Sequence, residues 1–478
     1  MKSLNFFVCF VISVCFVFSP QQKQQKQETK PKFEKVSSYL IVVTISGLKA
    51  EDVNDNAANR LRIPTLQSLR TKGAYAVSVE SVYPSLINPA HATIASGALP
   101  ADHGITSDFP FNEQSGSQSE EPYRLAKEIK TDTIWDAAKR GGLVTAAVGY
   151  PLTAGATIDF NLPVAFDEGL SDETESGIRQ IISKQFVNPP DLLDRLTPEI
   201  LNSPFAANKK LKEIAGNQRI DHCIAVAAAN LIEKQRPNLL LINFNSYAKS
   251  VKKYGVQSRE AILALEFIDD LLKKIIDSTE RAQLTNELTI FVVTDFGSMN
   301  IEQIFNPNVV LAKKGFLTTG GEGRITSWRA VAQTFGGSAA IFVRDRQDEK
   351  TSREVEKVFT ELHEKPDSPI WRVVSRREAS QLGADPRAVL YLDAAPSYAM
   401  SSRATGSTIS KTSDRAAHGF LPSRSEIRAT LIISGKGIKN GAKIEYARLI
   451  DIAPTAARLL GLEMRTARGR VFYEVISQ

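Results

Sequence analysis

The stretch YLIVVTIS, from Tyr39 to Ser46, is a short and almost unbroken run of apolar and β-branched residues. Four later runs share this character: LVTAAVG (Leu143 to Gly149), NLLLINF (Asn238 to Phe244), LTIFVVTD (Leu288 to Asp295) and ATLIIS (Ala429 to Ser434). Runs that are apolar at both odd and even positions indicate strands buried on two faces. The pattern therefore predicts a central sheet that is covered on both sides.

Helical patterns separate these runs. Thr131 to Thr133 precede IWDAAKRGG, which has a helix start signal before it and two glycines at its end. Between Ala261 and Ile276, the spacing places four apolar side chains on one face: Leu265, Ile268, Leu272 and Ile275. Strands that alternate with helices favour a parallel sheet, so we expect an α/β fold with a mainly parallel sheet and helices on both faces.

Two segments depart from this alternation. Ser338 to Asp345, a charged helical pattern from Arg353 to His363, and the runs WRVVSRREA and AVLYLDA read as strand, helix and two strands. We therefore expect a small α+β insertion over residues 338–394, at the edge of the main sheet. Phe186 to Gln218 is rich in proline and charge, which indicates surface helices or a cap.

The composition of the 478 residues is that of a globular protein. Hydrophobic residues make up 42% and charged residues 23%, and the formal net charge is +6. These values exclude a disordered or fibrous chain. No basic stripe interleaved with aromatic residues is present in the sequence, so we expect no nucleic-acid partner.

The N-terminus carries the pattern of a targeting segment. Met1 and Lys2 precede an apolar run from Leu4 to Phe18, and a polar tract begins at Gln21. We interpret residues 1–20 as a signal peptide or a signal anchor, 21–38 as a polar linker, and 39–478 as one domain that contains the insertion. The segment leaves a cleaved leader and a membrane tether both open. Either one predicts a protein that is secreted, periplasmic or membrane-anchored and faces away from the cytoplasm.

Of the three cysteines, Cys9 and Cys15 lie in the N-terminal segment, and Cys223 is the one thiol beyond it. A catalytic thiol is one interpretation of Cys223. Its neighbourhood, IDHCIAVAAANLI, is an apolar helical pattern in which a buried cysteine is ordinary. The pattern favours the structural interpretation.

Ligands of open parallel sheets bind beyond the carboxyl ends of the strands, so the residues after each strand are the candidates for a site. Those segments include YPSLINPAHATIASG from Tyr83, ALPADHGITSD to Asp108, NSYAKSVKKYG from Asn245, TDFGSM from Thr294 and AHGF from Ala417. Together with TIWDAAKRGGLVTAAVGYP, GGSAAIFVRD and HGFLPSRSEIRATLIISGKG, they make the chain resemble the type I phosphodiesterase/nucleotide pyrophosphatase family of the alkaline phosphatase superfamily. The resemblance runs from Tyr39 to about Leu462 and implies an alkaline-phosphatase-like fold.

The resemblance also implies a site. Members of this family hold two zinc ions with Asp and His side chains and use a threonine nucleophile to hydrolyse phosphodiesters or phosphate monoesters. Two such cations activate the nucleophile and neutralise the phosphoryl oxygens. The positions that match the metal ligands are Ser46, Ala248, Lys252, Asp295, Phe296 and His418, the nucleophile position is Ile87, and Asp108 stands where the family has an asparagine that steadies a phosphoryl oxygen.

Only Asp295 and His418 keep the chemistry of a metal ligand, and the resemblance assigns them to different metals. Catalytic zinc takes about three protein ligands, and isoleucine has no lone pair with which to attack phosphorus. We therefore expect a dismantled site without a cofactor, in a catalytically inactive homologue that acts as an extracytoplasmic binding protein. Its partner would be an unknown protein or a small anionic ligand. The alternative is an active phosphodiesterase or phosphatase with an altered metal site.

Several side chains near the lost nucleophile carry further expectations. Ser85 and Thr93 are possible substitute nucleophiles, although neither has an evident activating base. Asn88 and Pro89 have the types of an N-cap and a first helical residue, which would place Ile87 at the turn before a helix. We expect Lys252 to pair with Asp295 in place of a metal, or else to belong to a solvated face with its neighbouring lysines. A zinc cluster built from the other histidines, His91, His103, His222 and His363, is the remaining alternative.

Overall fold

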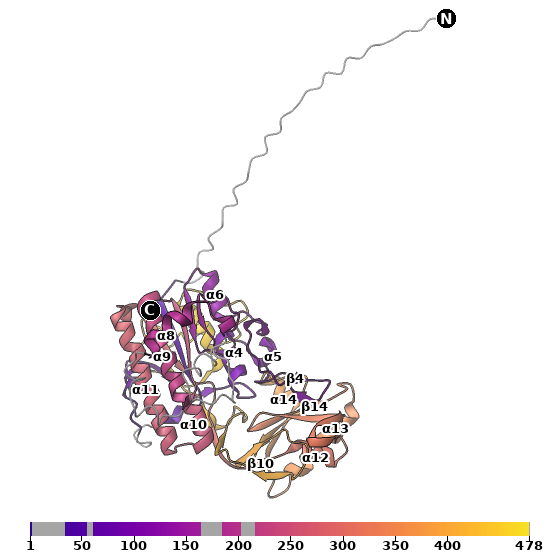
Figure 1. The fold of residues 1–478 in the computed structure, drawn as a ribbon. Coiled ribbons are helices and arrows are strands. Elements are labelled where there is room, and N and C mark those ends of the chain that lie inside the picture. Colours follow the sequence, from indigo (N-terminus) through magenta and orange to yellow (C-terminus); the bar gives the residue numbers. More distant parts are fainter. Residues whose placement is uncertain (2–33, 55–60, 164–183, 202–215, 478) are drawn as a thin grey trace.

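The computed structural model describes residues 1, 34–54, 61–163, 184–201 and 216–477 (Figure 1). The expected leader, with Cys9 and Cys15, and most of the expected linker lie outside the described residues. So does the central part of the segment expected to form surface helices, residues 202–215. Within the described part of the chain, no helix combines the length and apolarity that crossing a membrane requires.

An eight-stranded sheet with the order β21-β2-β20-β9-β1-β8-β6-β7 forms the centre of the larger lobe. Strand β1 (Tyr39–Ile45) pairs in parallel with β8 (Leu239–Phe244) on one side and with β9 (Leu288–Val293) on the other. Strands β6 (Thr145–Val148) and β7 (Phe160–Leu162) extend the parallel part beyond β8. The predicted α/β class with a mainly parallel sheet is confirmed.

One predicted strand has the opposite direction. The run ATLIIS forms β20 (Leu431–Gly435), which is antiparallel to β9 and to β2 (Gly73–Ala76), while β21 (Ala442–Ile444) is parallel to β2. A strand buried on both faces has the same apolar pattern in either direction, so the sequence left the direction open. The sheet is therefore mixed at this edge.

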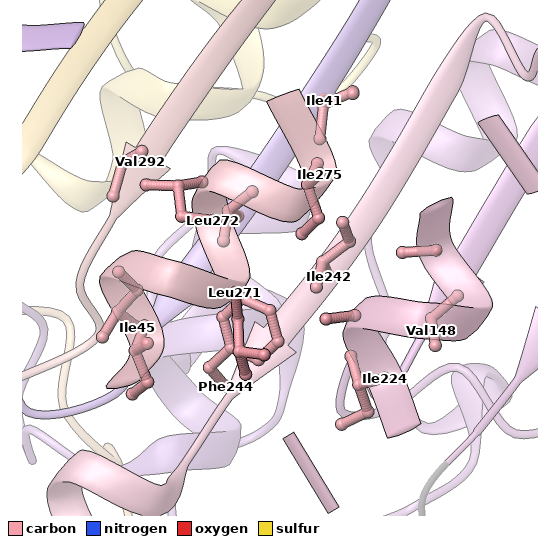
Figure 2. Packing of buried hydrophobic residues seen from close by; sticks show 14 of the residues in the cluster. Ile41, Ile45, Val148, Ile224, Ile242, Phe244, Leu271, Leu272, Ile275 and Val292 are labelled. Atoms are coloured by element: carbon pink, nitrogen blue, oxygen red, sulfur yellow. The ribbon is translucent and has the colours of Figure 1, made fainter. Parts of the chain in front are cut away.

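Helices cover both faces of the sheet. Alternate residues of β1 point to opposite faces, so Ile41 and Val43 pack in one core and Leu40 and Val42 in the other. The first core is closed by α3 (Pro64–Thr71), α8 (Leu192–Leu201), α9 (Gly216–Gln235), α10 (Ser246–Tyr254) and α11 (Arg259–Arg281). Figure 2 shows side chains of that core from the strands and the helices, among them Ile242 of β8 and Ile275 of α11. The second core is closed by α4 (Ile87–Ser96), α6 (Ile134–Arg140) and α15 (Ile452–Leu459).

The predicted helix start at Thr133 is present with its capping groups. The Thr133 hydroxyl accepts a 3.3 Å hydrogen bond from the backbone N–H of Asp136, and the Asp136 carboxylate accepts from the Thr133 backbone N–H. At the start of α11, the Ser258 hydroxyl accepts a single hydrogen bond from the backbone N–H of Ala261. These bonds satisfy donors that the first helical turn leaves unpaired.

The second lobe lies at the edge of the main sheet (Figure 1). This lobe contains an antiparallel sheet of four strands, with the order β13 (Ala330–Thr334), β14 (Ser338–Val343), β16 (Leu390–Ala394) and β15 (Ile370–Ser375). The lobe also contains the helices α13 (Glu349–His363) and α14 (Arg376–Gln381). Around the four-stranded sheet are β10 (Met299–Phe305), α12 (Pro307–Lys313), β11 (Leu317–Thr319), β12 (Ile325–Trp328), β17 (Ser397–Met400), β18 (Ile409–Lys411) and β19 (Ala416–Ala417).

The expected bounds of the insertion, 338–394, are therefore too narrow. The core of the lobe takes residues from Ile301 to Ile427 and also includes Tyr83, Leu86 and Phe111 from the first third of the chain. The extra strands, such as MNIEQIF in β10, mix polar with apolar residues and are half exposed, so their sequence signal is weak. The remaining short elements are α1 (Ala50–Asn54), β3 (Val79–Glu80), α5 (Pro100–His103), β4 (Phe111–Asn112), β5 (Ser117–Gln118) and β22 (Ala447–Arg448).

Candidate functional site

A pocket of about 120 Å³ lies beyond the carboxyl ends of β8 and β9, where the first turn of α4 and helix α10 face each other. This is the edge of a parallel sheet at which ligands bind. Its lining residues are Ile87, Asn88, Asp108, Phe109, Pro122, Tyr123, Asn245, Ala248, Lys249, Lys252, Phe296 and His418. Six of the eight predicted site positions are thus together, and the two others, Ser46 and Asp295, are buried and do not line the pocket.

The Asp295 carboxylate is fully buried and bound by protein donors. Its Oδ2 accepts a 2.7 Å hydrogen bond from the Ser46 hydroxyl, and its Oδ1 accepts from the backbone N–H groups of Gly47, at 3.1 Å, and Phe296, at 2.8 Å. Burial raises the pKa of Asp295, and the hydrogen bonds from Ser46, Gly47 and Phe296 oppose that rise. Nδ1 of the His91 imidazole lies 3.7 Å from Oδ2. The hydrogen bonds that a buried carboxylate needs are supplied here from within the chain.

His91 connects this carboxylate to the start of α4. Burial lowers the pKa of His91, so its ring is neutral near pH 7. Its Nδ1 lies 2.9 Å from the Ile87 carbonyl oxygen and donates to it, and its Nε2 lies 3.1 Å from the Thr44 hydroxyl oxygen. His91 therefore acts as a hydrogen-bonding residue beneath the pocket. This role differs from the zinc-ligand role that was considered for it from the sequence.

Phe296 and His418 form a stacked pair in the pocket wall. Their ring centroids are 4.0 Å apart and the rings are inclined by 15°. Burial and then the nearby charge of Lys252 lower the pKa of His418 to about 3, so the imidazole is neutral over the physiological range. The His418 ring, which stacks on the buried Phe296, therefore presents a neutral aromatic surface to the pocket.

The first turn of α4 is already occupied by an acidic side chain. The Asn88 backbone N–H donates a 2.8 Å hydrogen bond to Oδ1 of Asp108, and the Asn88 amide donates to the carbonyl oxygens of Asp108 and Tyr123. A helix N-terminus attracts an anion, and here the chain supplies that anion itself. The helix begins at Ile87 with Leu86 as its N-cap, so the expected N-cap at Asn88 is wrong by two positions; the Asn88 side chain binds the loop instead.

Lys252 does not pair with Asp295. Its side chain is 50% exposed at the pocket mouth, and its ion-pair partner is Asp414, with 3.9 Å between Nζ and Oδ2. The expected pairing with Asp295 is therefore wrong. Asp295 already has donors from Ser46 and two backbone groups, whereas a lysine near the end of an exposed helix keeps its ammonium hydrated.

The other reactive candidates lie away from the pocket wall. The buried Ser85 hydroxyl donates to the carbonyl oxygens of Val82, at 2.9 Å, and Phe420, at 3.2 Å. Thr93 lies within α4, and its hydroxyl is 3.0 Å from Nε2 of His103. Neither hydroxyl lines the pocket, so the structure gives no geometric support to a substitute nucleophile.

Cys223 and the two remaining histidines are likewise remote from the pocket lining. Cys223 lies on α9 and packs against the first core, where burial raises its pKa to about 12 and keeps the thiol protonated. His222 is its neighbour on α9, and Nδ1 of His363 lies 3.0 Å from the Ile370 carbonyl oxygen in the second lobe. The structural interpretation of Cys223 fits this environment.

The residues of the site do not fit two zinc ions. In the described part of the chain, no three His, Cys, Asp or Glu side chains are grouped closely enough to hold a metal ion. Zinc takes about four ligands, of which a catalytic site supplies three from the protein. Asp295 is buried among internal donors, and His418 is stacked on Phe296, so neither is arranged as part of such a set.

Sequence reasoning did not identify four of the lining residues: Phe109, Pro122, Tyr123 and Asn245. Phe109, Pro122 and Tyr123 flank the short β4–β5 hairpin, a region with no periodicity from which their direction could be read. Lys249 also lines the pocket, and the sequence could have identified it. It lies three residues before Lys252 on α10 and so shares a helix face with that predicted position.

Comparison of the sequence with known proteins identifies relatives of this chain. The family model for type I phosphodiesterase/nucleotide pyrophosphatase matches residues 40–420. Human ectonucleotide pyrophosphatase/phosphodiesterase family member 1 is 22% identical over 239 residues, which span 49% of this chain and 21% of that protein. Member 7 of the same group from rat is 19% identical over 299 residues, 61% of this chain and 55% of that protein. The chain thus matches about half or less of these relatives' lengths.

Solved structures show the same fold. Murine ectonucleotide pyrophosphatase/phosphodiesterase 5 superposes with a TM-score of 0.63 at 15% identity, covering 92% of this chain and 100% of that one. An inactive variant of that mouse protein in complex with AMP gives the same values. At this level of identity the similarity extends to the alkaline-phosphatase-like architecture, and the chemistry of the site has to be argued from the residues.

Proposed function

The chain belongs to the type I phosphodiesterase/nucleotide pyrophosphatase family, and from this premise we propose that it is a catalytically inactive member that binds a ligand in the pocket between α4 and α10. We place this role outside the cytoplasm. The apolar segment from Leu4 to Phe18 and the names of the relatives, which are ectonucleotide enzymes, support that location.

The observation that carries the proposal is the hydrogen bonding of Asp295. The family resemblance assigns both Ser46 and Asp295 to acidic metal ligands, yet here the Ser46 hydroxyl donates to the Asp295 carboxylate at 2.7 Å. A hydroxyl and two backbone N–H groups take over the stabilisation that a dication would give a buried carboxylate. The site is therefore complete without a metal.

Two further replacements act in the same direction. Ile87 stands at the nucleophile position and has no group that can attack phosphorus. Asp108 binds the N–H of Asn88, which is the kind of backbone donor that would otherwise stabilise a phosphoryl oxygen. A substrate phosphate would meet a carboxylate there, and the repulsion between like charges disfavours its binding.

A retained pocket favours binding over a purely structural role. The space of about 120 Å³ has apolar walls from Ile87, Phe109 and Phe296 and carries the polar groups of Lys249 and Lys252. Concave sites with apolar walls and a few placed polar groups are typical of ligand sites.

The test combines metal analysis with an activity assay. The purified full-length chain should contain no stoichiometric zinc and should not hydrolyse bis(p-nitrophenyl) phosphate, with human family member 1 assayed in parallel as the active reference. Two zinc ions per chain together with chelator-sensitive turnover would establish the alternative, an active phosphodiesterase with an altered metal site. An Asp295→Asn variant separates that outcome from contamination, because a contaminant's activity would be unchanged in the variant preparation.

A further inference from the structure

We infer that the ligand of this pocket is an aromatic acid, bound with its ring against His418, which stacks on Phe296, and with its anionic group between the α10 lysines at the mouth. The inference rests on the proposed non-catalytic function and gives it a ligand class. It also fixes a polarity, in which the charged end of the ligand faces solvent and the ring faces the sheet.

The inner wall of the pocket selects a ring. Phe296 is completely buried, and its ring stacks on that of His418 with a centroid separation of 4.0 Å. Tyr123 and Phe109 add two more aromatic side chains to the lining. Aromatic faces and edges attract each other at separations of about 4.5–7 Å, and a flat ring fits such walls with little loss of its own conformational freedom.

The charges at the two sides of the pocket differ in sign. On the α4 side, the Asp108 carboxylate already occupies the N–H of Asn88, so an incoming anion would find an acceptor where it needs a donor. On the α10 side, Lys249 and Lys252 both line the pocket, three residues apart on one helix face. The anionic group of a ligand is therefore stabilised at the α10 side alone.

The lysines are positioned for a group that stays close to water. The Lys252 side chain is 50% exposed, and its contact with Asp414 is long at 3.9 Å between two half-exposed groups. Such a surface pair contributes little, so a ligand carboxylate can compete for the ammonium at small cost. A carboxylate at the mouth also keeps part of its hydration, which avoids the penalty of full burial.

The volume limits the ring system. A cavity of about 150 Å³ accommodates a benzene ring, so the roughly 120 Å³ here suits one ring, with a second ring or the acidic group extending into the open mouth. We therefore expect one or two fused rings that carry a single acidic group.

The experiment uses four probes that separate ring from charge. Isothermal titration calorimetry of the full-length chain at pH 7.5 compares 2-naphthoate, its neutral amide 2-naphthamide, the cation 2-naphthylmethylammonium and inorganic phosphate. We expect 2-naphthoate to bind at least tenfold more tightly than the amide, the cation to bind more weakly than the amide, and phosphate not to bind. Equal affinities for the three naphthalene probes would overturn the charge assignment, and no naphthalene binding would overturn the ligand class.

Variants locate the binding. The double change Lys249→Gln and Lys252→Gln should reduce 2-naphthoate affinity to that of the amide and leave amide binding unchanged. The matched control is Lys253→Gln, because Lys253 is an exposed neighbour on α10 that lies over the Tyr254 ring and does not line the pocket. Ala248→Trp should abolish binding of all naphthalene probes by filling the pocket, with the thermal midpoint recorded to show that the variant folds. Unchanged 2-naphthoate binding in the double variant would refute the role of the lysines.

A parallel assay separates this inference from the proposed function. Metal-dependent hydrolysis of 2-naphthyl phosphate would overturn the proposed non-catalytic role whatever the binding data show. An inert protein that binds 2-naphthoate no better than 2-naphthamide would overturn the ligand class alone.

Discussion

The hydroxyl of Ser46 donates a 2.7 Å hydrogen bond to Oδ2 of Asp295, and both side chains are completely buried. The two residues follow neighbouring strands, β1 and β9, at the edge of the sheet where a ligand site is expected. Two acids at these positions would repel each other unless cations lay between them. With serine at one position, the pair becomes a donor and an acceptor, and the repulsion between two acids is absent.

This relationship predicts the effect of restoring an acid. Ser46→Asp should lower the free energy of unfolding by about 3–5 kcal/mol, because it places an unpaired carboxylate against a buried one. Ser46→Ala, which only removes the donor, should cost about 1–3 kcal/mol. Urea denaturation at pH 7 checks both values. A Ser46→Asp protein as stable as the wild type without added metal would contradict the self-sufficient site.

The nucleophile position gives a prediction about activity. Ile87→Thr should restore no zinc-dependent hydrolysis of bis(p-nitrophenyl) phosphate, since a hydroxyl without a metal or a base stays un-ionised. Ile87→Val serves as the control for packing, because it is β-branched and similar in size to threonine but lacks the hydroxyl. Turnover in the threonine variant that the valine variant lacks would show that metal and activating groups are present after all.

Asp108 should contribute to stability as the internal anion of α4. Asp108→Ala removes an acceptor for the Asn88 N–H and should cost about 0.5–2 kcal/mol, the usual effect of losing a helix-capping side chain. Asp102→Ala is the comparison, since Asp102 pairs with Arg468, whose side chain is 65% exposed, and such pairs contribute about 1 kcal/mol or less. Thermal and urea unfolding of the two variants should therefore differ. Equal losses would assign Asp108 no capping role.

The fold was accessible from the sequence because its central strands are buried on both faces. The runs from Tyr39, Asn238 and Leu288 match β1, β8 and β9 to within two residues at each end. The direction of β20 could not be predicted, because a strand that is apolar at every position has the same pattern in parallel and antiparallel pairing. The second lobe was underestimated for a related reason, since its flanking strands, such as β10, are half exposed and irregular.

The sequence predicted which positions form the site, but it did not predict the contacts between their side chains. The family resemblance brought Ile87, Asp108 and His418 to one pocket, although their separations in sequence are large. The partner of Asp295 was misjudged, because Lys252 was chosen by charge whereas backbone N–H groups and a serine hydroxyl satisfy the carboxylate. Backbone donors are invisible in a sequence, and they decide how a buried acid is stabilised.

In the second lobe, a buried ion pair predicts a large loss on truncation. Nε of Arg424 donates a 2.7 Å hydrogen bond to Oδ2 of Asp393, and the guanidinium lies 4.1 Å from the Trp371 ring centroid. Arg424→Ala leaves a buried carboxylate without its cation and should destabilise the protein by about 3–5 kcal/mol. The control Arg428→Ala breaks a more exposed pair with Glu80 and should cost about 1 kcal/mol. Guanidinium denaturation measures both, and similar costs would refute the distinction.

The buried histidine next to α4 predicts how stability depends on pH. The ring of His103 is completely buried, its Nδ1 accepts from the Ile105 backbone N–H at 3.1 Å, and burial lowers its pKa from 6.5 to about 3. Below pH 6.5 His103 is protonated in the unfolded chain but stays neutral in the folded chain. The free energy of unfolding therefore decreases as the pH falls from 6.5 toward 3, by up to about 1.4 kcal/mol per pH unit. His103→Asn keeps an acceptor but cannot titrate. Urea denaturation from pH 7 to pH 4 should show a shallower loss in this variant, by about 1 kcal/mol per unit, and equal slopes would show that His103 is protonated in the folded state.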